Sequence, residues 1–503
     1  SAFELPTGEI TVGGRTSSPT FPTTPGAFDE SASIQTLDAF VLRISSDGSS
    51  VIYSTFLGDS TPSAQKERPL VAPIGDETVV LFTSGFSHPV TEGAYASPTE
   101  ASRDVFIARL NDSGTDVSFM AKIGGYSTDV ARTLQILEDE SIMFAGQGSS
   151  DLPAATKIGL HEGPDFDAGF AMRLSATGSD LLQSVVIFDS AFDTYSIFDA
   201  AVLNDGRILF GGQAASNLLP ATADAFQVST VEPTGPDHAD AYWMLLDPTW
   251  SEIEYASYLS SPSSDDLRLI VPIDNTACWL IFATGSGAIP FPSSIVPVTL
   301  GTIPMPWIAF LFDLESHEVV QARWISQQSI EAAALDQDGG LVVATFATPD
   351  ASFPFLSPGA PFGPPGTLGI HKLDVMGERW VESRAFGGGS GATLPNFSQF
   401  SAPHRLVIGG ESQAPGMFVT ENALDPTLSG LPSLDGFVAI FDLTPDGVTR
   451  YGDPVNGCTG ECRASIRALP TSGEPDFGIG CIGAPRSTPG ALVIGFGATE
   501  LPL

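Results

Sequence analysis

One segment recurs seven times along the chain, and this repeat limits the possible folds more than any other feature of the sequence. Its copies combine a small residue, an aromatic residue and alternating apolar positions: DAFVLRI (38–44), DVFIARL (104–110), DAGFAMRL (167–174), DAYWMLL (240–246), PWIAFLF (306–312), LGIHKLD (368–374) and DGFVAIF (435–441). Their starts are separated by 66, 63, 73, 66, 62 and 67 residues. A period near 66 residues is too long for a solenoid turn and suits a four-stranded propeller blade with one long loop.

Each repeat contains four segments with the pattern of β-strands, which we call a, b, c and d in chain order. In the first repeat they cover residues 1–5, 9–14, 38–44 and 50–58. Apolar and polar residues alternate in strands c and d, and Asp47-Gly48 between them is typical of a hairpin turn. Strand b is apolar on both faces, as expected for a strand between two neighbouring sheets. The sequence therefore predicts an all-β fold.

The last repeat decides the predicted number of blades. Residues 464–503 contain two further strand patterns, a copy of the b–c loop (487–491) and an apolar run (492–498), but no counterpart of strand d. Dividing 503 residues by eight gives about 63, close to the period. We therefore predict one β-propeller domain over 1–503 with eight blades, in which the cysteine-containing partial repeat 458–503 closes or caps the propeller. Seven blades with a C-terminal appendage is the alternative.

Composition excludes several classes of function. The chain has 59 acidic and 21 basic residues, a formal net charge of −38. A surface this acidic repels nucleic acid, so no nucleic-acid partner is expected. The sequence has no apolar run of the length that a transmembrane helix needs, and its hydrophobic content of 42% is too high for a disordered chain.

The b–c loop carries a second motif. It reads TFPTTPGAF (20–28) in the first repeat, with degraded copies LPATADAF (219–226), FPFLSPGAP (353–361) and STPGAL (487–492). Together with DAFV in strand c and YSTFLG (53–58) in strand d, this motif resembles the SBBP-type bacterial β-propeller repeat over essentially the whole chain. The resemblance implies a propeller in a secreted or surface-attached bacterial protein. It supplies no catalytic residue.

Candidate partner-binding residues come from the connections between strands. Long loops on a rigid scaffold are common binding sites, and the b–c loops are the long ones here. Phe21, Phe291, Phe353 and Phe355 lie in these loops, and Trp250 in a c–d turn is expected to be exposed. The alternative for the phenylalanines is that they fill gaps between blades, since phenylalanine is usually buried.

The four cysteines lead to a prediction about location. Cys458 and Cys462 lie four residues apart and are predicted to form a disulfide, with Cys481 as the rival partner. Cys278 lies in an apolar run and is predicted to be free and buried. A disulfide would place the protein outside the cytosol.

The sequence contains no catalytic, cofactor or metal motif. The nearest approach to the zinc motif H-E-x-x-H is His317-Glu318, where glutamine replaces the second histidine. The pairs Asp165/Asp167 and Asp336/Asp338 make calcium binding possible, but they lack EF-hand spacing, so we predict no cofactor. The aspartate that begins most copies of strand c is interpreted as a structural cap.

Two hypotheses of function remain. The first is a non-enzymatic secreted or cell-surface module that docks partner proteins or assembles with itself. Without strand d, the last blade would offer an open edge for β-augmentation. The second is an extracellular propeller enzyme that acts on polysaccharide at the mouth of the channel. Two or more carboxylates or histidines within hydrogen-bond reach of each other at that mouth would favour the enzyme.

Overall fold

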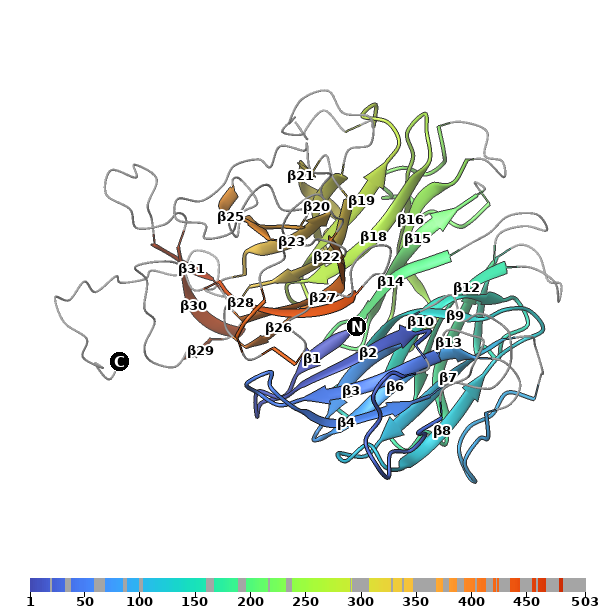
Figure 1. Ribbon diagram of the computed structural model, residues 1–503. Coiled ribbons are helices and arrows are strands. Elements are labelled where there is room, and N and C mark those ends of the chain that lie inside the picture. Colours follow the sequence, from blue (N-terminus) through green and yellow to red (C-terminus); the bar gives the residue numbers. More distant parts are fainter. Residues whose placement is uncertain are drawn as a thin grey trace, which may run out of the picture. The chain divides into compact units, whose positions relative to one another are not determined.

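We analysed a computed structural model of the chain (Figure 1). It describes residues 1–18, 20–31, 38–57, 68–84, 88–98, 103–159, 167–188, 196–215, 218–231, 238–289, 291, 307–326, 329–336, 339–346, 368–373, 380–386, 393–402, 405–412, 419–421, 423–424, 435–443, 455–457, 460–466 and 479–482. The described residues form β-strands and connections without a helix, which bears out the all-β prediction. Among them, no helix is available to span a membrane. The chain divides into two compact units, residues 1–329 with 419–435 and residues 330–418 with 436–503.

The first unit contains five antiparallel blades of the β-propeller type. Blade 1 consists of β1 (Ala2–Glu4), β2 (Ile10–Thr16), β3 (Asp38–Ile44) and β4 (Val51–Phe56). Blade 2 consists of β5 (Leu70–Ile74), β6 (Glu77–Ser84), β7 (Asp104–Leu110) and β8 (Val117–Ile123). Blade 3 consists of β9 (Val130–Ile136), β10 (Ile142–Ser149), β12 (Asp167–Leu174) and β13 (Leu181–Ile187), with β11 (Thr156–Ile158) added beside β13. Blade 4 consists of β14 (Ser196–Val202), β15 (Ile208–Ala214), β16 (Asp240–Leu246) and β17 (Ile253–Leu259). Blade 5 consists of β18 (Asp265–Pro272), β19 (Ala277–Thr284), β20 (Trp307–Asp313) and β21 (Glu318–Ser326).

The second unit contains a sixth blade and two smaller sheets. Blade 6 consists of β22 (Ser329–Leu335), β23 (Leu341–Phe346), β24 (Leu368–Leu373) and β25 (Trp380–Phe386). The first three-stranded sheet consists of β26 (Thr393–Ala402), β27 (Arg405–Ser412) and β28 (Asp435–Asp442). The second consists of β29 (Val455–Gly457), β30 (Gly460–Ile466) and β31 (Ile479–Ile482). Six blades thus have four or more described strands, and the predicted count of eight is not confirmed. The predicted final strand, 492–498, lies outside the described residues.

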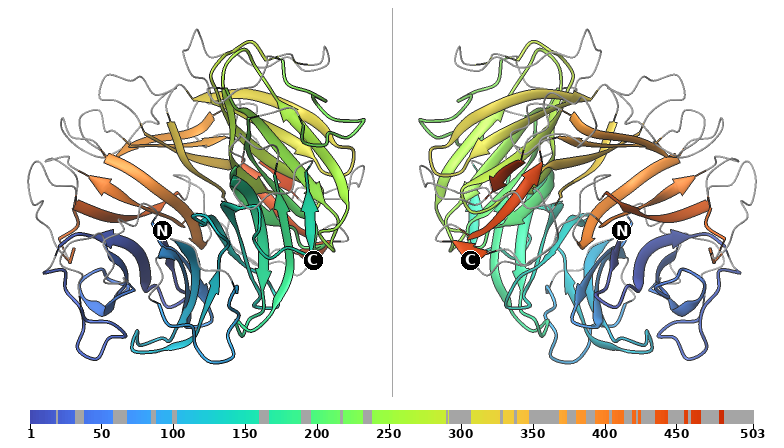
Figure 2. Two further views of the ribbon diagram at one scale, coloured as in Figure 1. Left: turned by 90° about the vertical axis from the view of Figure 1, so that its right-hand side faces the viewer. Right: turned by 90° about the vertical axis from the view of Figure 1, so that its left-hand side faces the viewer.

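Consecutive blades of the first unit pack face to face. The innermost strand a of each blade lies against the blade before it: β5 against β1 and β2, β9 against β5 to β7, β14 against β9, β10 and β12, and β18 against β14 to β16. Figure 2 shows the same sheets following one another in sequence order from blue to yellow-green. Strand b is buried on both faces, as in β6, whose residues after Glu77 are all buried, because each of its faces meets a layer of side chains. This explains why its sequence is continuously apolar.

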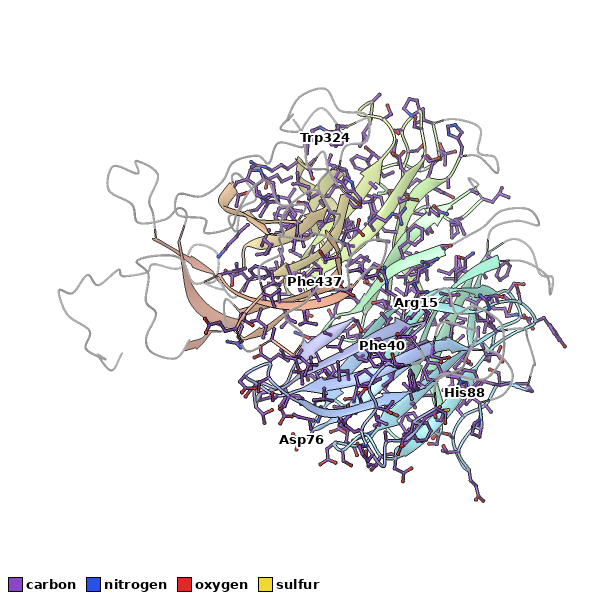
Figure 3. The ribbon with its side chains drawn as sticks, viewed as in Figure 1. Arg15, Phe40, Asp76, His88, Trp324 and Phe437 are labelled. Atoms are coloured by element: carbon purple, nitrogen blue, oxygen red, sulfur yellow. The ribbon has the colours of Figure 1, made fainter. Side chains whose placement is uncertain are left out.

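The blade order gives each blade of the first unit two different ends. The short a–b and c–d turns lie at one end, which we call the turn end, and the b–c and d–a connections lie at the other, the loop end. At the turn end, Arg43 of β3 is 2% exposed and reaches into blade 2. It donates hydrogen bonds to the carbonyl oxygen of Asp76 at 3.0 Å and to that of Asp112 at 3.3 Å. Figure 3 labels Asp76.

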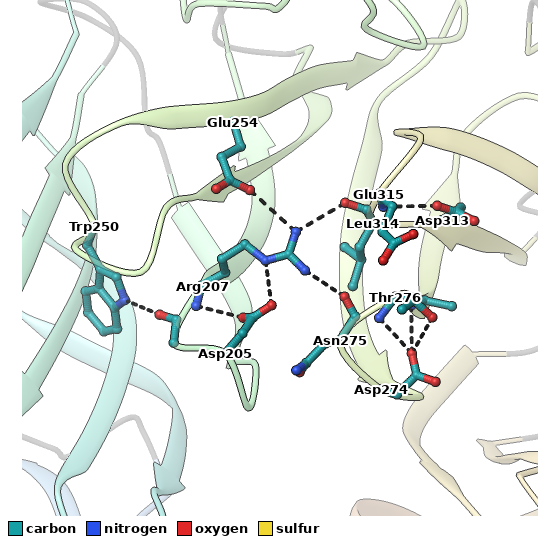
Figure 4. Close-up of polar contacts among 12 residues, drawn as sticks. Asp205, Arg207, Trp250, Glu254, Asp274, Asn275, Thr276, Asp313, Leu314 and Glu315 are labelled. Atoms are coloured by element: carbon teal, nitrogen blue, oxygen red, sulfur yellow. Dashed lines mark hydrogen bonds and ion pairs between the residues drawn. The ribbon is translucent and has the colours of Figure 1, made fainter. Parts of the chain in front are cut away.

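The same contact recurs at other junctions between blades. Arg109 of β7 reaches the carbonyl oxygen of Ala176 at 3.4 Å and the Glu140 carboxylate at 3.6 Å, both in blade 3. Arg207 of blade 4 donates to the carbonyl oxygens of Asn275 at 2.6 Å and Leu314 at 3.2 Å in blade 5 (Figure 4). Some of the few cations of this acidic chain therefore link neighbouring blades.

Candidate functional site

Two of the four candidate phenylalanines belong to the residues that the structure describes, and both pack against aromatic side chains of the blades. Phe21 is half-buried, with its ring centroid 4.3 Å from that of Phe40 on β3 (Figure 3). Phe291 is half-buried between Phe226 and Phe310, at centroid distances of 6.2 and 6.0 Å. Phe291 therefore lies between aromatic residues of blades 4 and 5, as in the alternative in which phenylalanine fills gaps between blades, whereas Phe21 packs on its own blade. Partner binding by these residues stays a prediction. Phe353 and Phe355 lie outside the described residues.

The prediction that Trp250 is exposed is wrong. Its relative exposure is 1%, and it belongs to the core between blades 3 and 4. The backbone of Trp250 has a φ of 58°, in the left-handed region, and its indole Nε1–H donates to the carbonyl oxygen of Gly206 at 3.2 Å (Figure 4). The c–d turn of blade 4 is thus tied to the a–b turn of the same blade.

The b–c loops of blades 1 to 4 cover the outer edges of their own blades. In blades 1, 2 and 4, one threonine of the loop pairs with strand d through its backbone N–H, at N–O distances of 3.0, 3.1 and 3.0 Å: Thr24 with Ser54, Thr91 with Met120, and Thr222 with Ala256. In blade 3 the loop forms β11, which pairs parallel with β13. Unpaired edges readily bind other strands, so these loops protect the blades.

The aromatic residue at the end of the TFPTTPGAF motif has a structural function. Phe28 donates its backbone N–H to Gly114 in the c–d turn of blade 2 at 2.9 Å, and Tyr95 donates to Gly178 in blade 3 at 2.8 Å. The described parts of the loops of blades 1 and 2 therefore run along strand d and contact the next blade. This geometry favours a structural interpretation of the motif over the binding function predicted from loop length.

Two pairs of aspartates are buried at the loop end of the first unit. Asp104 begins β7 and lies near Asp129, which precedes β9; Asp240 begins β16 and lies near Asp265, which begins β18. Their relative exposures are 5% or less. Each pair therefore brings together strand c of one blade and strand a of the next.

The carboxyl groups of Asp129 and Asp265 accept backbone N–H groups. Asp129 accepts from Gly125 at 2.8 Å and Ser149 at 2.9 Å, and Asp265 accepts from Ser261 at 2.6 Å. Burial, the largest cause, together with the neighbouring aspartate raises the pKa of each to about 7. Burial likewise raises the pKa of Asp240 to about 6. Because Asp129 and Asp265 are buried and bonded to backbone N–H groups, their arrangement favours a structural function over contact with a substrate.

Sequence reasoning missed Asp129 and Asp265, because attention fell on the aspartate of strand c. The available signal was an aspartate that follows strand d after a few small residues, GGYSTD (124–129) and SSPSSD (260–265). Two of the strand c aspartates contact side chains: Lys122 Nζ lies 3.4 Å from Asp104, and Ser260 bonds to Asp240.

A second group that the sequence did not reveal lies on three consecutive innermost strands. Strand a of blades 3, 4 and 5 each contains a β-bulge, in which one residue has no partner on strand b. The three bulged residues are Arg132, Phe198 and Arg268. Bulges redirect side chains and are frequent beside functional sites. In blades 3 and 4 they lie opposite Gly146 and Gly212, where a Cβ would come within 2.0 and 1.8 Å of a backbone oxygen.

These bulged residues form the Arg–Phe–Arg cluster (Arg132, Phe198 and Arg268). The Arg132 guanidinium carbon lies 5.3 Å from the centre of the Phe198 ring, and that of Arg268 lies 4.4 Å from it. Both distances are typical of cation–π contacts. Both arginines are exposed, and Phe198 is half-buried. The cluster thus presents two guanidinium groups held by one aromatic ring.

Asp199, next to Phe198, connects the same three strands. It accepts the backbone N–H of Ile270 in β18 at 2.8 Å and bonds to the Thr133 side chain of β9. Desolvation raises the pKa of Asp199 to about 6. Asp199 therefore fixes the spacing of the strands that carry the cluster.

The remaining candidates for chemistry have structural partners or lie outside the described residues. Asp336 is buried and forms an ion pair with Lys372, and the side chains of Asp165, Asp167 and Asp338 are not described. Within the described ranges, no group of three or more His, Cys, Asp or Glu side chains is placed to hold a metal ion. His317 bonds to Asp224 at 2.8 Å and His371 is buried.

The cysteine predictions are tested only in part. Cys278 is free and fully buried, as predicted, and burial strongly raises the pKa of its thiol. The backbone of β30 places Cys462 opposite Val455, and Cys481 of β31 lies opposite Ala464. Cys458 and the side chains of Cys462 and Cys481 lie outside the described residues. The disulfide stays a prediction.

Comparison with known proteins gives only distant similarities. No protein-family model and no curated protein matches the sequence. A puromycin-hydrolyzing peptidase of Mycobacterium tuberculosis is 10% identical, with a TM-score of 0.44 over 88% of this chain and 52% of that one. The WD40 β-propeller domain of Doa1 is 9% identical, with a TM-score of 0.38 over 80% of this chain and 94% of that one. The NanB sialidase of Streptococcus pneumoniae is 8% identical, with a TM-score of 0.32 over 82% of this chain and 64% of that one. The chain spans about half the length of the acylaminoacyl peptidases that it matches.

Proposed function

We propose that the protein is a non-enzymatic interaction module that works outside the cell or at a bacterial cell surface, where it docks partner proteins or assembles with itself. The observation that carries this proposal is the contrast between the buried acidic groups and the exposed arginines of the first unit. The buried carboxyl groups of Asp129 and Asp265 are occupied by backbone N–H groups, whereas Arg132 and Arg268 project into solvent. A guanidinium binds anions well, but it does not release its proton in a protein.

The construction of the blades supports the same proposal. Arginines link neighbouring blades at the turn end, and the b–c loops cover strand d in blades 1 to 4. A scaffold of this kind keeps its surface in one arrangement, which lowers the entropy cost of binding a partner. The resemblance to the SBBP-type repeat and the predicted disulfide support a location outside the cytosol.

The test measures association of the full chain directly. Sedimentation velocity over a wide range of concentration, and retention of proteins from the extracellular fraction of the producing bacterium on immobilised chain, are expected to reveal self-association or a saturable partner. The variant that lacks 492–503 tests whether the last repeat is the docking edge. A chain that stays monomeric, retains no saturable partner and is found in the cytosol would overturn the proposal.

One observation favours the polysaccharide-degrading enzyme as a second candidate. The pKa of Asp199, raised to about 6 by desolvation, suits a general acid or base, and Asp199 lies next to the exposed cluster. Its bonds to the backbone of Ala200 and Ile270 favour a structural function instead. Release of reducing sugar from polysaccharides, abolished by Asp199→Asn, would establish the enzyme and contradict the first proposal.

A further inference from the structure

The Arg–Phe–Arg cluster has the charge and exposure of a binding site. Arg268 forms an ion pair with Asp266 at 2.6 Å, so its charge is partly balanced. Arg132 makes no ion pair within the part of the chain that the structure describes. In a chain with a net charge of −38, an exposed arginine without an acidic partner is unexpected, because carboxylates are abundant. An anionic ligand would supply the missing partner.

The residues of the cluster are also held by contacts within the chain. Each arginine is the extra residue of a bulge, stacks on Phe198, and belongs to a strand that Asp199 ties to its neighbours. A guanidinium held by an aromatic ring loses less conformational entropy on binding than a free side chain. The arrangement therefore favours binding of a ligand over a purely structural function for the exposed arginines.

We propose that Arg132, Phe198 and Arg268 form a subsite for the carboxylate group of a small ligand on the innermost strands of blades 3 to 5. The planar guanidinium of Arg132 binds a planar carboxylate through two parallel hydrogen bonds. The net charge selects against ligands with several negative charges, since each additional charge is repelled by the acidic protein. A ligand with a single carboxylate is therefore favoured over a phosphate monoester. This subsite does not depend on the docking of a partner protein.

The experiment compares three sugars that differ only at carbon 6. Glucuronate carries a carboxylate there, glucose 6-phosphate carries a phosphate, and glucose is neutral. Isothermal titration of the full chain is expected to give a roughly millimolar dissociation constant for glucuronate, as for a ligand of its size. Binding of glucose 6-phosphate should be several-fold weaker, and glucose should give no saturable heat.

Three variants test the residues. Arg132→Ala should weaken glucuronate binding at least tenfold, and Arg132→Lys should weaken it several-fold, because lysine keeps the charge but loses the two-pronged geometry. Arg405→Ala is the matched control, since it removes one exposed arginine from β27 in the second unit and should leave binding unchanged. Arg132 is exposed, so its variants should keep the melting temperature, which is measured in parallel.

Several results would overturn the subsite. They are equal binding of glucuronate and glucose, no binding of glucuronate, or full binding by folded Arg132→Ala. Tighter binding of glucose 6-phosphate would also reject the preference for a single charge. These titrations are independent of the association measurements, so failure of the subsite and failure of the interaction module are distinguishable.

Discussion

In the first unit, guanidinium groups link neighbouring blades at the turn end, whereas buried carboxyl groups lie at the loop end. At the turn end, arginine guanidinium groups donate to carbonyl oxygens, as Arg43 does to Asp76 and Arg207 to Asn275. At the loop end, buried carboxyl groups accept N–H groups, as Asp129 does from Gly125 and Asp265 from Ser261. At the turn end, backbone N–H groups also have acidic partners, but these aspartates, such as Asp47 and Asp247, are not buried.

The comparison also explains how an acidic chain uses charge. The arginines at the turn end are always charged and bind several oxygens at once. The aspartates at the loop end are shielded from water, which raises their pKa values toward neutrality. The contacts at the turn end should therefore contribute the same free energy of unfolding across this pH range. The contribution of the loop end should change with pH.

The largest expected effect is a loss of stability between pH 4.5 and pH 8. The folded-state pKa values of Asp129, Asp240 and Asp265 are raised to about 7, 6 and 7. A group with a raised pKa in the folded state contributes fully below its unfolded value near 4 and loses that contribution as pH rises through the folded value. The free energy of unfolding should fall by roughly 4 kcal/mol or more, since a tenfold change in an acid dissociation constant is worth about 1.4 kcal/mol.

Denaturant titration at several pH values in high salt measures this loss, and the salt screens the general repulsion of a chain charged at −38. Asp265→Asn should make the free energy of unfolding depend less on pH, because an amide does not titrate. Burial lowers the pKa values of the Ser1 amino group and His371, and these two groups contribute a change of opposite sign that the comparison with the variant cancels. An unchanged pH dependence in folded Asp265→Asn would contradict the assignment of a buried, protonated carboxyl group to the loop end.

The second effect tests the turn end. Arg43→Ala removes the donors for the carbonyl oxygens of Asp76 and Asp112 and the cation–π contact with Tyr53. We expect a loss of about 3 kcal/mol, because the variant also leaves the buried hydroxyl groups of Thr11 and Thr78 without their guanidinium donor. Unlike the effect at the loop end, this loss should be the same at pH 5 and pH 8. Arg405→Ala, at an exposed position, is the control, and an equal loss in both variants would exclude a special function for Arg43.

The third and smallest effect concerns the bulges between the two ends. Gly146→Ala places a Cβ 2.0 Å from the carbonyl oxygen of Val130, a backbone atom that cannot move away freely. We expect a loss of about 2 kcal/mol, typical of overpacking, together with weaker binding of glucuronate because Arg132 is displaced. Melting curves and titration of the same sample measure both. If Gly146→Ala is destabilised but binds glucuronate normally, the bulge does not position Arg132 for the subsite.

The strands could be predicted from the sequence because their signals are local. The predicted c strands 38–44, 104–110, 167–174 and 240–246 coincide with β3, β7, β12 and β16. The alternation of apolar and polar residues involves neighbours in the chain, so it can be recognised without knowledge of the fold. The buried, free state of Cys278 followed from the same kind of signal.

The site could not be predicted in this way. Trp250 was expected in solvent because it lies in a turn, but its indole is bonded to Gly206, which is 44 residues away. The b–c loops were predicted to bind partners because they are long, yet the TFPTTPGAF motif in the first of them pairs with strand d, and its Phe28 donates to Gly114 of the next blade. In both cases the sequence gives the residue but not its partner.

The sequence by itself determined the all-β fold, the four-strand repeat and its period, because strand patterns and turn residues act over a few positions. Only the tertiary structure decided which charged residues face each other. Arg132, Phe198 and Arg268 are separated by more than 60 residues at each step, and they meet because strand a of three consecutive blades places its bulged residue beside the other two. Such contacts depend on the packing of whole blades, which no local pattern encodes.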